Sequence, residues 1–318
     1  MDTAGASGHH RAMGTTTTST PPAAVARGAA DVTLRPIRGD DAGSVARILY
    51  EAFAEIHDRH RFPRDFPTPD AAAQLTESFI AHPSIWGVVA ERDGRIVGSN
   101  FVDERGPVRG VGPITVDPNG QHRGAGRRLM TAVLERSSGA AGVRLLQDAF
   151  NVQSLGLYAS LGFRATDPVV VMGGRPSAPV PEGFDVRPMT ESDIEAGAAL
   201  HRDVHGFERA QELRDALHAP GLAPFVATRD GEIAAYATTL TFFPAAHAVA
   251  VSANAMAALI AGTLAAGEAP ASFLLPTRQH ELFEWALAAG LRVVKPMNYM
   301  IMGQGHQPQG AWIPSVLY

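Results

Sequence analysis

The sequence predicts an α+β fold with a mixed α/β sheet, built twice along the chain. Three landmarks recur in the same order in the two halves of its 318 residues. They are a short strand followed by a helix, a two-stranded hairpin with an Asp-Gly turn, and a late helix followed by a strand. Such a repeat indicates that one unit was duplicated. We therefore expect two tandem units, each a mostly antiparallel twisted sheet flanked by helices.

Composition divides the chain into segments. Residues 1–30 are small and polar, with a threonine run and no apolar signal core, and we expect a disordered tail there. The proline-rich stretch "GGRPSAPVPEG" over residues 173–183 is typical of a linker. The predicted units are therefore residues 31–175 and 184–318, joined by residues 176–183.

Each element of the first unit has its own signal. "VTLRPIRGDDAGSVARILYEAF" predicts a strand and a helix, and "TPDAAAQLTESFIAHP" predicts a second helix. "WGVVAERDGRIVGSNFV" predicts two strands joined by an Asp-Gly turn, followed by a third strand that ends at Val116. The remaining expected elements are a helix from about Gly124, the strand "VRLLQDAF", a helix over residues 152–160 and a strand over residues 168–172.

The second unit repeats these signals in the same order. "FDVRPMTESDIEAGAALHRDV" matches the opening strand and helix, and "PFVATRDGEIAAYATTL" matches the hairpin. "ELFEWALAAGLRVVKPMNYMIMG" matches the late helix and strand. These matches support a second unit with the same fold as the first.

Charge and composition argue against several classes of function. Residues 31–175 hold 17 arginines and 17 acidic residues, and residues 176–318 hold 8 basic and 14 acidic residues, so neither half has the basic excess of a nucleic-acid binder. No apolar run reaches the roughly 18 residues of a membrane span. Without cysteine there is no disulfide, thiolate nucleophile or Cys-based metal cage. We expect a cytoplasmic protein with no nucleic-acid, membrane or metal partner, and we leave a homodimer open.

A glycine-bearing loop precedes the helix expected from Gly124. The first turn of a helix carries N–H groups without intrahelical partners and the positive end of the helix dipole. A phosphate can approach these amides closely where the residues are glycine or alanine, as at Gly124, Ala125 and Gly126. The loop therefore predicts a pyrophosphate cradle, and a tight turn is the alternative interpretation. Three arginines would add charge-assisted bonds to further phosphates: Arg123, Arg127 and Arg128.

Two motifs together resemble a known family. "VDPNGQHRGAG", followed about 25 residues later by "NVQSLGLYASLGF", is similar to the pattern of the GCN5-related N-acetyltransferases. The resemblance covers roughly residues 31–175 and implies acetyl-CoA as co-substrate, with no metal. It also implies that the main chain of Ile114 and Val116 pairs with the pantetheine arm. The further coenzyme-binding residues that it implies are Gln121, Arg123, Gly124, Ala125, Gly126, Arg127, Arg128, Asn151 and Ser154.

The resemblance places Tyr158 near the thioester sulfur. A tyrosine with an ordinary pKa of about 10 can protonate a departing thiolate when it is close and oriented. The amide of Val116 would stabilise the oxyanion. Because the chain has no cysteine, we expect direct transfer in a ternary complex rather than a cysteinyl acyl-enzyme. The candidates for the general base are Asp103, Glu104 and Asp148, with a water relay as the alternative.

The acceptor is expected to be a small primary amine, because no charged face suggests a peptide tail or a nucleic acid. In the resembling family the segment corresponding to "RFPRDFP" helps to cover the acceptor site, and we expect Phe62 and Phe66 to line it, with Glu104 and Asp148 nearby. The histidine pairs His57/His60 and His201/His205 are interpreted as partly exposed helix residues, since neither has a third metal-ligand motif.

The second unit lacks the signals of a coenzyme site. At the position of the cradle it reads "VAVSANAMAALIAGTLAAG", and Trp285 stands where Tyr158 would recur. We therefore expect a degenerate unit that binds no coenzyme. The alternatives are a mycothiol-synthase-like tandem acetyltransferase with a working second unit, a non-catalytic acyl-CoA-binding or regulatory module, and a structural partner. Lys295 is the single lysine of the chain, which we attribute to genomic base composition rather than to function.

Overall fold

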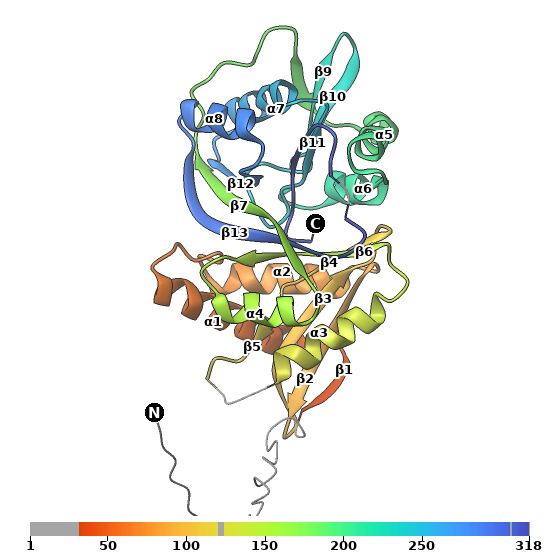
Figure 1. Ribbon diagram of the computed structural model, residues 1–318, viewed down its shortest axis with the longest axis vertical. Helices are drawn as coiled ribbons and strands as arrows, with labels where there is room; N and C mark the ends of the chain where they lie inside the picture. Colours follow the sequence, from red (N-terminus) through yellow and green to blue (C-terminus); the bar gives the residue numbers. More distant parts are fainter. Residues whose placement is uncertain (1–31, 120–123, 306, 318) are drawn as a thin grey trace, which may run out of the picture.

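The computed structural model describes residues 32–119, 124–305 and 307–317. Its two halves lie one above the other in Figure 1, with the first unit below and the second above. Each half is a mostly antiparallel sheet flanked by helices, as the sequence predicted. The expected tail over residues 1–30, together with Gln121 and Arg123, lies outside the described residues.

The elements follow the order expected from the sequence. The first unit consists of β1 (Thr33–Pro36), η1 (Gly39–Asp41), α1 (Ala42–His60), α2 (Pro69–Ala81), β2 (Ile85–Arg92), β3 (Arg95–Asp103), β4 (Val108–Val111), β5 (Thr115–Val116), α3 (Ala125–Arg136), β6 (Gly142–Asp148), α4 (Val152–Ser160) and β7 (Arg164–Gly174). The second unit consists of β8 (Asp185–Pro188), η2 (Glu191–Asp193), α5 (Ile194–His205), α6 (Ala210–His218), β9 (Phe225–Arg229), β10 (Glu232–Ala237), β11 (Ala248–Ala250), α7 (Ala253–Ala265), β12 (Ala271–Pro276), α8 (His280–Ala288), β13 (Arg292–Gly303) and β14 (Ala311–Ile313).

Local chemistry accounts for the repeated turns. The hairpin between β2 and β3 turns at Asp93 and Gly94, whose φ angles are 50° and 72°. The hairpin between β9 and β10 turns at Asp230 and Gly231, with φ angles of 54° and 84°. Positive φ at both central residues is the geometry that Asp-Gly favours in two-residue hairpins. The expected hairpins are therefore confirmed in both units.

An ion pair between an arginine and a buried aspartate is also repeated. In the first unit Arg35 Nη1 lies 2.7 Å from Asp41 Oδ2, and in the second unit Arg187 Nη1 lies 2.8 Å from Asp193 Oδ2. Both aspartates also accept a backbone N–H three residues earlier, from Arg38 and from Thr190. The two strand-to-helix connections thus share the same hydrogen bonds, as expected of a duplicated unit.

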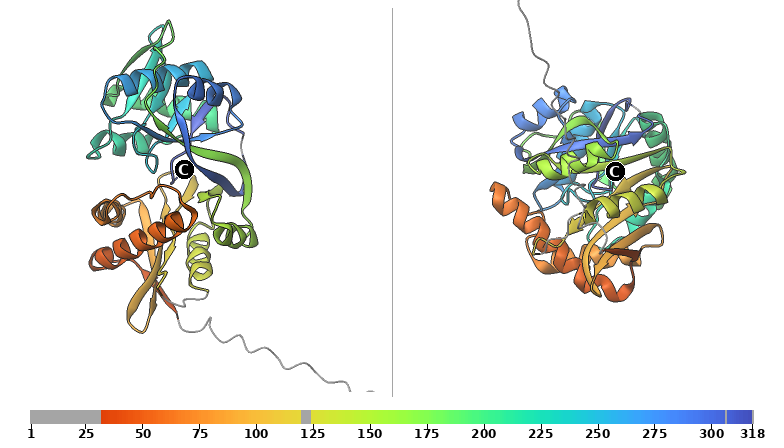
Figure 2. Two further views of the ribbon diagram at one scale, coloured as in Figure 1. Left: turned by 90° about the vertical axis from the view of Figure 1, so that its left-hand side faces the viewer. Right: turned by 60° about the horizontal axis from the view of Figure 1, so that its bottom comes forward.

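Helices cover both faces of the first sheet. Val45 of α1 and Phe79 of α2 pack with Phe101 of β3 on one face. Leu129 of α3 and Tyr158 of α4 belong to the hydrophobic cluster of the other face. The left view of Figure 2 separates these layers, with the orange-red α1 and α2 on one side of the strands and the yellow-green α3 and α4 on the other.

The two units exchange a strand at their junction. Within the described residues the strands form a nine-stranded sheet, in the order β1-β2-β3-β4-β6-β13-β7-β12 with β5 on β3, and a five-stranded sheet, β14-β11-β10-β9-β8. β13 of the second unit lies between β6 and β7 of the first, so that Met297 faces Asp148 and Lys295 faces Val171. β7 in turn pairs with β12. Figure 1 shows β7 and β13 crossing together between the halves.

This exchange means that strand pairing crosses the proposed boundary at residues 176–183. Residues 176–183 therefore remain a predicted linker along the sequence. In space, each unit depends on a strand from the other.

Candidate active site

The first sheet opens between β5 and β6. β4 and β6 pair in parallel from Val108 to Gly110, after which the chain leaves β6 and, in the described structure, β5 pairs with β3 alone. The Asp117 amide donates to the Val97 carbonyl at 2.9 Å, so Val116 forms a non-hydrogen-bonded pair with Gly98. The N–H and C=O of Val116 therefore point away from β3, toward the opening. An extended ligand chain can pair with this edge.

Helix α3 begins at the same end of the opening. Its N-cap is Gly124, with a φ of 88°, a left-handed conformation that favours glycine. Among the described residues no side chain caps this helix, and the Arg128 N–H donates to the Gly124 carbonyl at 3.1 Å. A Cβ atom at Gly124 would meet nothing within 4 Å among the described residues, so this glycine borders open space at the start of the helix.

The two arginines of this turn already have partners. Arg127 Nη2 donates to Ser160 Oγ at 2.6 Å, which links α3 to α4, and Arg128 Nη1 donates to the Val32 carbonyl. Each guanidinium carries five N–H donors, so these bonds leave others for a phosphate. Their expected role in coenzyme binding remains a prediction.

Asn151 and Ser154 hold the start of α4. The Asn151 side chain accepts the Ser154 N–H at 3.2 Å, and Ser154 Oγ donates to the Asn151 carbonyl at 3.0 Å. Gln147 Nε2, on β6, donates to Ser154 Oγ at 3.0 Å and to the Asn151 carbonyl at 2.8 Å. These residues form a helix cap fixed to β6, and their contact with the coenzyme arm remains a prediction.

Tyr158 is buried on the α3/α4 face of the sheet. It belongs to the same hydrophobic cluster as Ile114 and Val116, which border the opening. Burial raises the pKa of its hydroxyl well above the ordinary value, and the negative charge of Asp148 raises it further. Tyr158 therefore keeps its proton at neutral pH, as a proton donor must.

The opposite face of β6 carries an ionisable side chain, that of Asp148. Val143 and Leu145 belong to the cluster of Tyr158, whereas Leu146 packs with the cluster at the junction of the units. Because side chains alternate along a strand, Asp148 points to the same face as Leu146. The opening in the sheet thus has Tyr158 on one side and Asp148 on the other.

Asp148 belongs to a buried cluster of four charged or ionisable groups. Lys295 Nζ lies 2.7 Å from Asp148 Oδ1, 2.6 and 2.8 Å from the two oxygens of Asp65, and 3.0 Å from His57 Nε2. His57 and Lys295 are 0% and 2% exposed. We call these four residues the charge cluster.

The charge cluster has an excess of negative charge when His57 is neutral. Burial raises the pKa of Asp148, while His57 and Lys295 keep the pKa of Asp65 below its ordinary value against the opposing effect of burial. Burial lowers the pKa of His57, but the hydrogen bond and charge of Asp65 outweigh this effect, so the net shift is upward. His57 Nδ1 lies 2.7 Å from the Phe53 carbonyl and must donate to it, which leaves Nε2 facing the cluster.

Three members of this cluster offer atoms within 4.8 Å of one another, a spacing that a metal ion could use: His57, Asp65 and Asp148. Lys295 Nζ contacts all three of these residues. Its ammonium thus supplies the positive charge that the carboxylates require.

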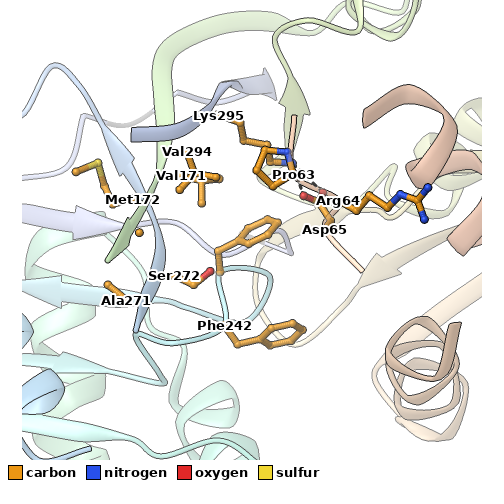
Figure 3. A pocket seen from close by; sticks show the side chains of 12 residues that line it. Pro63, Arg64, Asp65, Val171, Met172, Phe242, Ala271, Ser272, Val294 and Lys295 are labelled. Carbon is orange, nitrogen blue, oxygen red and sulfur yellow. Dashed lines mark hydrogen bonds and ion pairs between the residues drawn. The ribbon is translucent and has the colours of Figure 1, made fainter. Parts of the chain in front are cut away.

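A cavity of about 170 Å³ lies beside the charge cluster, between the two units. In Figure 3, Pro63, Arg64 and Asp65 approach it from the loop after α1, and Val171 and Lys295 approach it from β7 and β13. Phe242 of the second unit closes another side. Apart from Asp65, Lys295 and Arg64, most of the wall is apolar or small.

The four residues expected near the acceptor occupy different places. Phe62 stacks on Phe150, with ring centroids 4.4 Å apart, directly after the end of α1. Phe66 is buried among α1 and α2 residues. Glu104 forms a salt bridge with Arg136 at 2.9 Å, at the end of β3, and of the four only Asp148 joins the charge cluster.

Asp103, the third base candidate, is held by arginines. Its Oδ2 lies 2.6 Å from Arg105 Nη2 and 3.7 Å from Arg209 Nη2 of the second unit. These cations keep the pKa of Asp103 below its ordinary value although burial opposes them. Of the three base candidates, only Asp148 lies on β6, a strand that borders the opening.

The interpretation of the histidine pairs as exposed was wrong for three of the four residues. His57 is 0% exposed, and His201 and His205 are 0% and 2% exposed. Their helices bury one face, and these histidines lie on it, so spacing along the helix gave no measure of exposure. Burial holds the pKa of His201 at about 3, so this residue stays neutral.

Sequence reasoning also missed His57, Asp65 and Lys295 as a group. The signal for Lys295 was present, since it is the only lysine in 318 residues, but we attributed it to base composition. Its contacts with two carboxylates now give it a structural reason. These contacts join β13 to α1 and the following loop, which no local pattern reveals.

The second unit differs at the position of the cradle. Its helix α7 is capped by Ser252, whose side chain accepts the Ala255 N–H at 3.2 Å, so a first-turn amide is already satisfied. The helix is buried along most of its length. Trp285 of α8, at the counterpart of Tyr158, packs against the second core. These features support the expectation that the second unit binds no coenzyme.

The geometry of the first unit agrees with a known family. Residues 47–163 match the model of the acetyltransferase (GNAT) family, a range that includes the opening, α3 and Tyr158. Residues 47–163 of the first unit thus match a GNAT acetyltransferase domain, and acetyl-CoA is the acyl donor that this family uses. No helix in the described part of the chain is long and apolar enough to cross a membrane.

Solved structures extend the likeness over both units. A protein of Pyrococcus horikoshii assigned as an acetyltransferase covers 93% of this chain and 98% of its own, with a TM-score of 0.69 and 16% identity. A GCN5-related N-acetyltransferase of Sphaerobacter thermophilus covers 88% and 98%, with a TM-score of 0.56 and 16% identity. A tandem GNAT protein from the clavulanic acid biosynthesis pathway covers 87% and 100%, with a TM-score of 0.55 and 13% identity. No curated protein sequence matches the chain. At these identities the likeness concerns the fold.

Proposed function

We propose that this protein transfers an acetyl group from acetyl-CoA directly to a small primary amine, in a ternary complex formed at the first unit. One observation carries the proposal: within the residues that the structure describes, a β5 edge with no strand partner, a start of α3 with no side-chain cap and the buried Tyr158 border a single opening. An extended thioester with a pyrophosphate at one end matches these three features.

Different residues of the opening would bind different parts of acetyl-CoA. The first-turn amides of α3, with Arg127 and Arg128 beside them, would hold the pyrophosphate. The outward main chain of Ile114 and Val116 would pair with the amides of the pantetheine arm. The thioester carbonyl then lies near the Val116 N–H, which stabilises the oxyanion of the tetrahedral intermediate.

The reaction removes two protons from the acceptor ammonium and delivers one proton to the departing thiolate. Asp148 takes a proton from the acceptor ammonium, and the neutral amine attacks the thioester carbon to form a C–N bond. The C–S bond then breaks, and the departing thiolate receives the proton of Tyr158. The second proton of the former ammonium returns to Tyr158, and Asp148 passes the first to solvent. The products are an N-acetylated amine, free coenzyme A and one proton.

The cavity beside the charge cluster supports a small acceptor. It is lined by Asp65 and Lys295 of the charge cluster, and its volume of about 170 Å³ is below the roughly 300–1,000 Å³ of pockets for drug-sized ligands. When His57 is neutral, the two carboxylates of the cluster outnumber its one ammonium, and this charge balance favours a cationic amine. An acceptor with a short apolar body and one ammonium group fits both features.

The first test is calorimetric titration of acetyl-CoA into the full chain and into a Gly124→Trp variant. We expect one site per chain, lost in the variant because the indole covers the first-turn amides. Release of coenzyme A thiol would then be screened against a panel of primary amines. Two sites per chain would support a mycothiol-synthase-like enzyme. Absence of binding would leave the loop as a turn and overturn the proposal.

A second measurement separates catalysis from binding alone. A non-catalytic acyl-CoA-binding module would bind acetyl-CoA and release no thiol with any amine of the panel. We expect thiol release that depends on the amine, because a binding module has no need of a proton donor at the sulfur.

A further inference from the structure

Lys295 reaches the first unit through the exchanged strand. It lies on β13, which belongs to the last third of the chain, yet β13 pairs with β6 and places Met297 opposite Asp148. Lys295 precedes Met297 by two residues on the same strand. Its side chain contacts Asp148, His57 and Asp65 on one face of the sheet. The second unit thus contributes a charged side chain to the acceptor side of the first.

The contacts of Lys295 fix its position closely. An ammonium has three N–H donors, and Nζ has three neighbouring partners: Asp65 at 2.6 Å, Asp148 at 2.7 Å and His57 at 3.0 Å. The side chain is 2% exposed. A buried charge is tolerated where it is paired and hydrogen-bonded, and here two carboxylates and an imidazole meet that requirement.

The same contacts constrain Asp148. Its Oδ1 binds Lys295, and its Oδ2 lies 3.7 Å from His57 Nε2. Without the ammonium, Asp148 and Asp65 would face each other as two buried carboxylates, and one of them would become protonated. Lys295 thus holds Asp148 in its ionised form and fixes the direction of its carboxylate, while Oδ2 stays outside the Lys295 contact.

We propose that Lys295 is a positioning residue for acetyl transfer: it is supplied by the second unit and keeps Asp148 ionised and oriented at the acceptor side of the first. This inference rests on the function proposed above. It gives the second unit a role in catalysis although that unit lacks a coenzyme cradle.

The kinetic test compares two substitutions of Lys295, with the best amine of the panel as acceptor. For Lys295→Met we expect kcat to fall about a hundredfold, as for other groups that orient a reacting pair, with the Kd of acetyl-CoA unchanged. The acid limb of the pH profile should move to higher pH. Asp148 loses its positive neighbour while the negative charge of Asp65 remains beside it, and both effects raise the pKa of Asp148. Lys295→Arg retains the positive charge but changes the shape of the side chain. For this variant we expect a lower kcat, while the acid limb of the pH profile stays close to its position in the parent protein.

Arg209→Met is the matched control. Arg209 is also a buried cation of the second unit, and it contacts a carboxylate of the first unit, Asp103, at 3.7 Å. We expect this variant to lower stability without moving the acid limb. If Lys295→Met and Arg209→Met change kcat and the limb to the same extent, Lys295 serves only stability and the proposal is overturned.

A spectroscopic readout does not depend on activity. Because the chain has one lysine, protein labelled with ¹³C at lysine Cε gives a single lysine side-chain NMR signal. We expect Asp148→Asn to shift this signal and acetyl-CoA to shift it in the parent, whereas Glu104→Gln leaves it in place. This experiment also decides the matter if Lys295→Met does not fold.

The two proposals fail in different ways. If calorimetry detects no acetyl-CoA binding by the parent, the proposed function is wrong. A different result would overturn only the role of Lys295. In that case acetyl-CoA binds and amines are acetylated, but Lys295→Arg has the kcat of the parent and the lysine NMR signal does not shift in Asp148→Asn.

Discussion

Tyr158 and Asp148 lie on opposite faces of one sheet and meet at the opening between β5 and β6. Burial raises the pKa of both, so the tyrosine retains its proton and the carboxylate has a greater affinity for one. In the mechanism that we propose, Tyr158 is therefore the proton donor on the coenzyme side and Asp148 the proton acceptor on the amine side. This polarity matches the direction in which protons move during acetyl transfer.

Removal of the Tyr158 hydroxyl should affect the chemical step. For Tyr158→Phe we expect kcat to fall by about 10²–10⁴, the usual contribution of a general acid, with the Kd of acetyl-CoA unchanged by calorimetry. Tyr236→Phe, a buried tyrosine of the second unit, is the control and should keep the parent rate. An unchanged kcat for Tyr158→Phe would mean that another group protonates the thiolate.

Asp103 should contribute to stability in a pH-dependent way. Its pKa in the folded state is lower than in the unfolded chain, so its contribution is complete above the unfolded value of about 3.9 and is lost as the pH falls toward the folded value. Asp103→Asn leaves Arg105 and Arg209 without this charge, and we expect a loss of about 3–5 kcal/mol at pH 7. Urea unfolding should show the difference from the parent narrowing as the pH is lowered from 6 toward 3.

Asp230→Asn is the control for this series, because that side chain is 95% exposed. Its free energy of unfolding should stay within about 0.5 kcal/mol of the parent. A difference between Asp103→Asn and the parent that stayed constant with pH would show that packing, rather than charge, explains the loss.

At the scale of elements, the two units differ most at one helix terminus. α3 starts at a glycine with no side-chain cap among the described residues, whereas α7 starts at Ser252, which caps the Ala255 amide. The same position in the repeat thus has open amides in one unit and a satisfied amide in the other. A helix that keeps a ligand site forgoes the stability of a cap.

Ser252→Ala tests this difference. The substitution removes the cap, and we expect a loss of about 1 kcal/mol in the free energy of unfolding, measured in urea. The titration with acetyl-CoA should still give one site per chain, because α7 is buried and carries no loop of the Gln-x-x-Gly-x-Gly type. A second site in this variant would show that the cap alone keeps the coenzyme out.

At the scale of the molecule, the exchange of β7 and β13 joins strands of both units in the nine-stranded sheet. β13 pairs with β6 and β7, and β7 pairs with β12. The nine-stranded sheet takes strands from both halves of the chain, whereas the five-stranded sheet is built from the second half alone. The charge cluster depends on the same exchange, since Lys295 lies on β13.

The chain should therefore unfold as one cooperative body. We expect a single urea transition, because loss of β13 from its place removes partners from both units. Trp86 lies in the first unit, and Trp285 and Trp312 lie in the second. Fluorescence of a Trp86→Phe variant and of a Trp285→Phe/Trp312→Phe variant should give the same midpoint as circular dichroism. Two separate midpoints would contradict the prediction.

The sequence by itself determined what depends on neighbouring residues. Strand alternation, helical periodicity and the Asp-Gly turns are local patterns, and they predicted the elements, their order and the duplication. The motifs around Gly124 and Tyr158 are also local, since each occupies one loop or one helix, and they pointed to the coenzyme side of the site.

Only the tertiary structure decided which strand completes which sheet. Pairing between β6 and β13 joins residues about 150 positions apart. The alternation of side chains along a strand is the same whether the strand pairs within its own unit or with the other unit, so the sequence pattern does not identify the partner. The burial of His57 and the contacts of Lys295 follow from that pairing. Local periodicity therefore predicted the fold of each unit, whereas long-range pairing determined how the two units share one site.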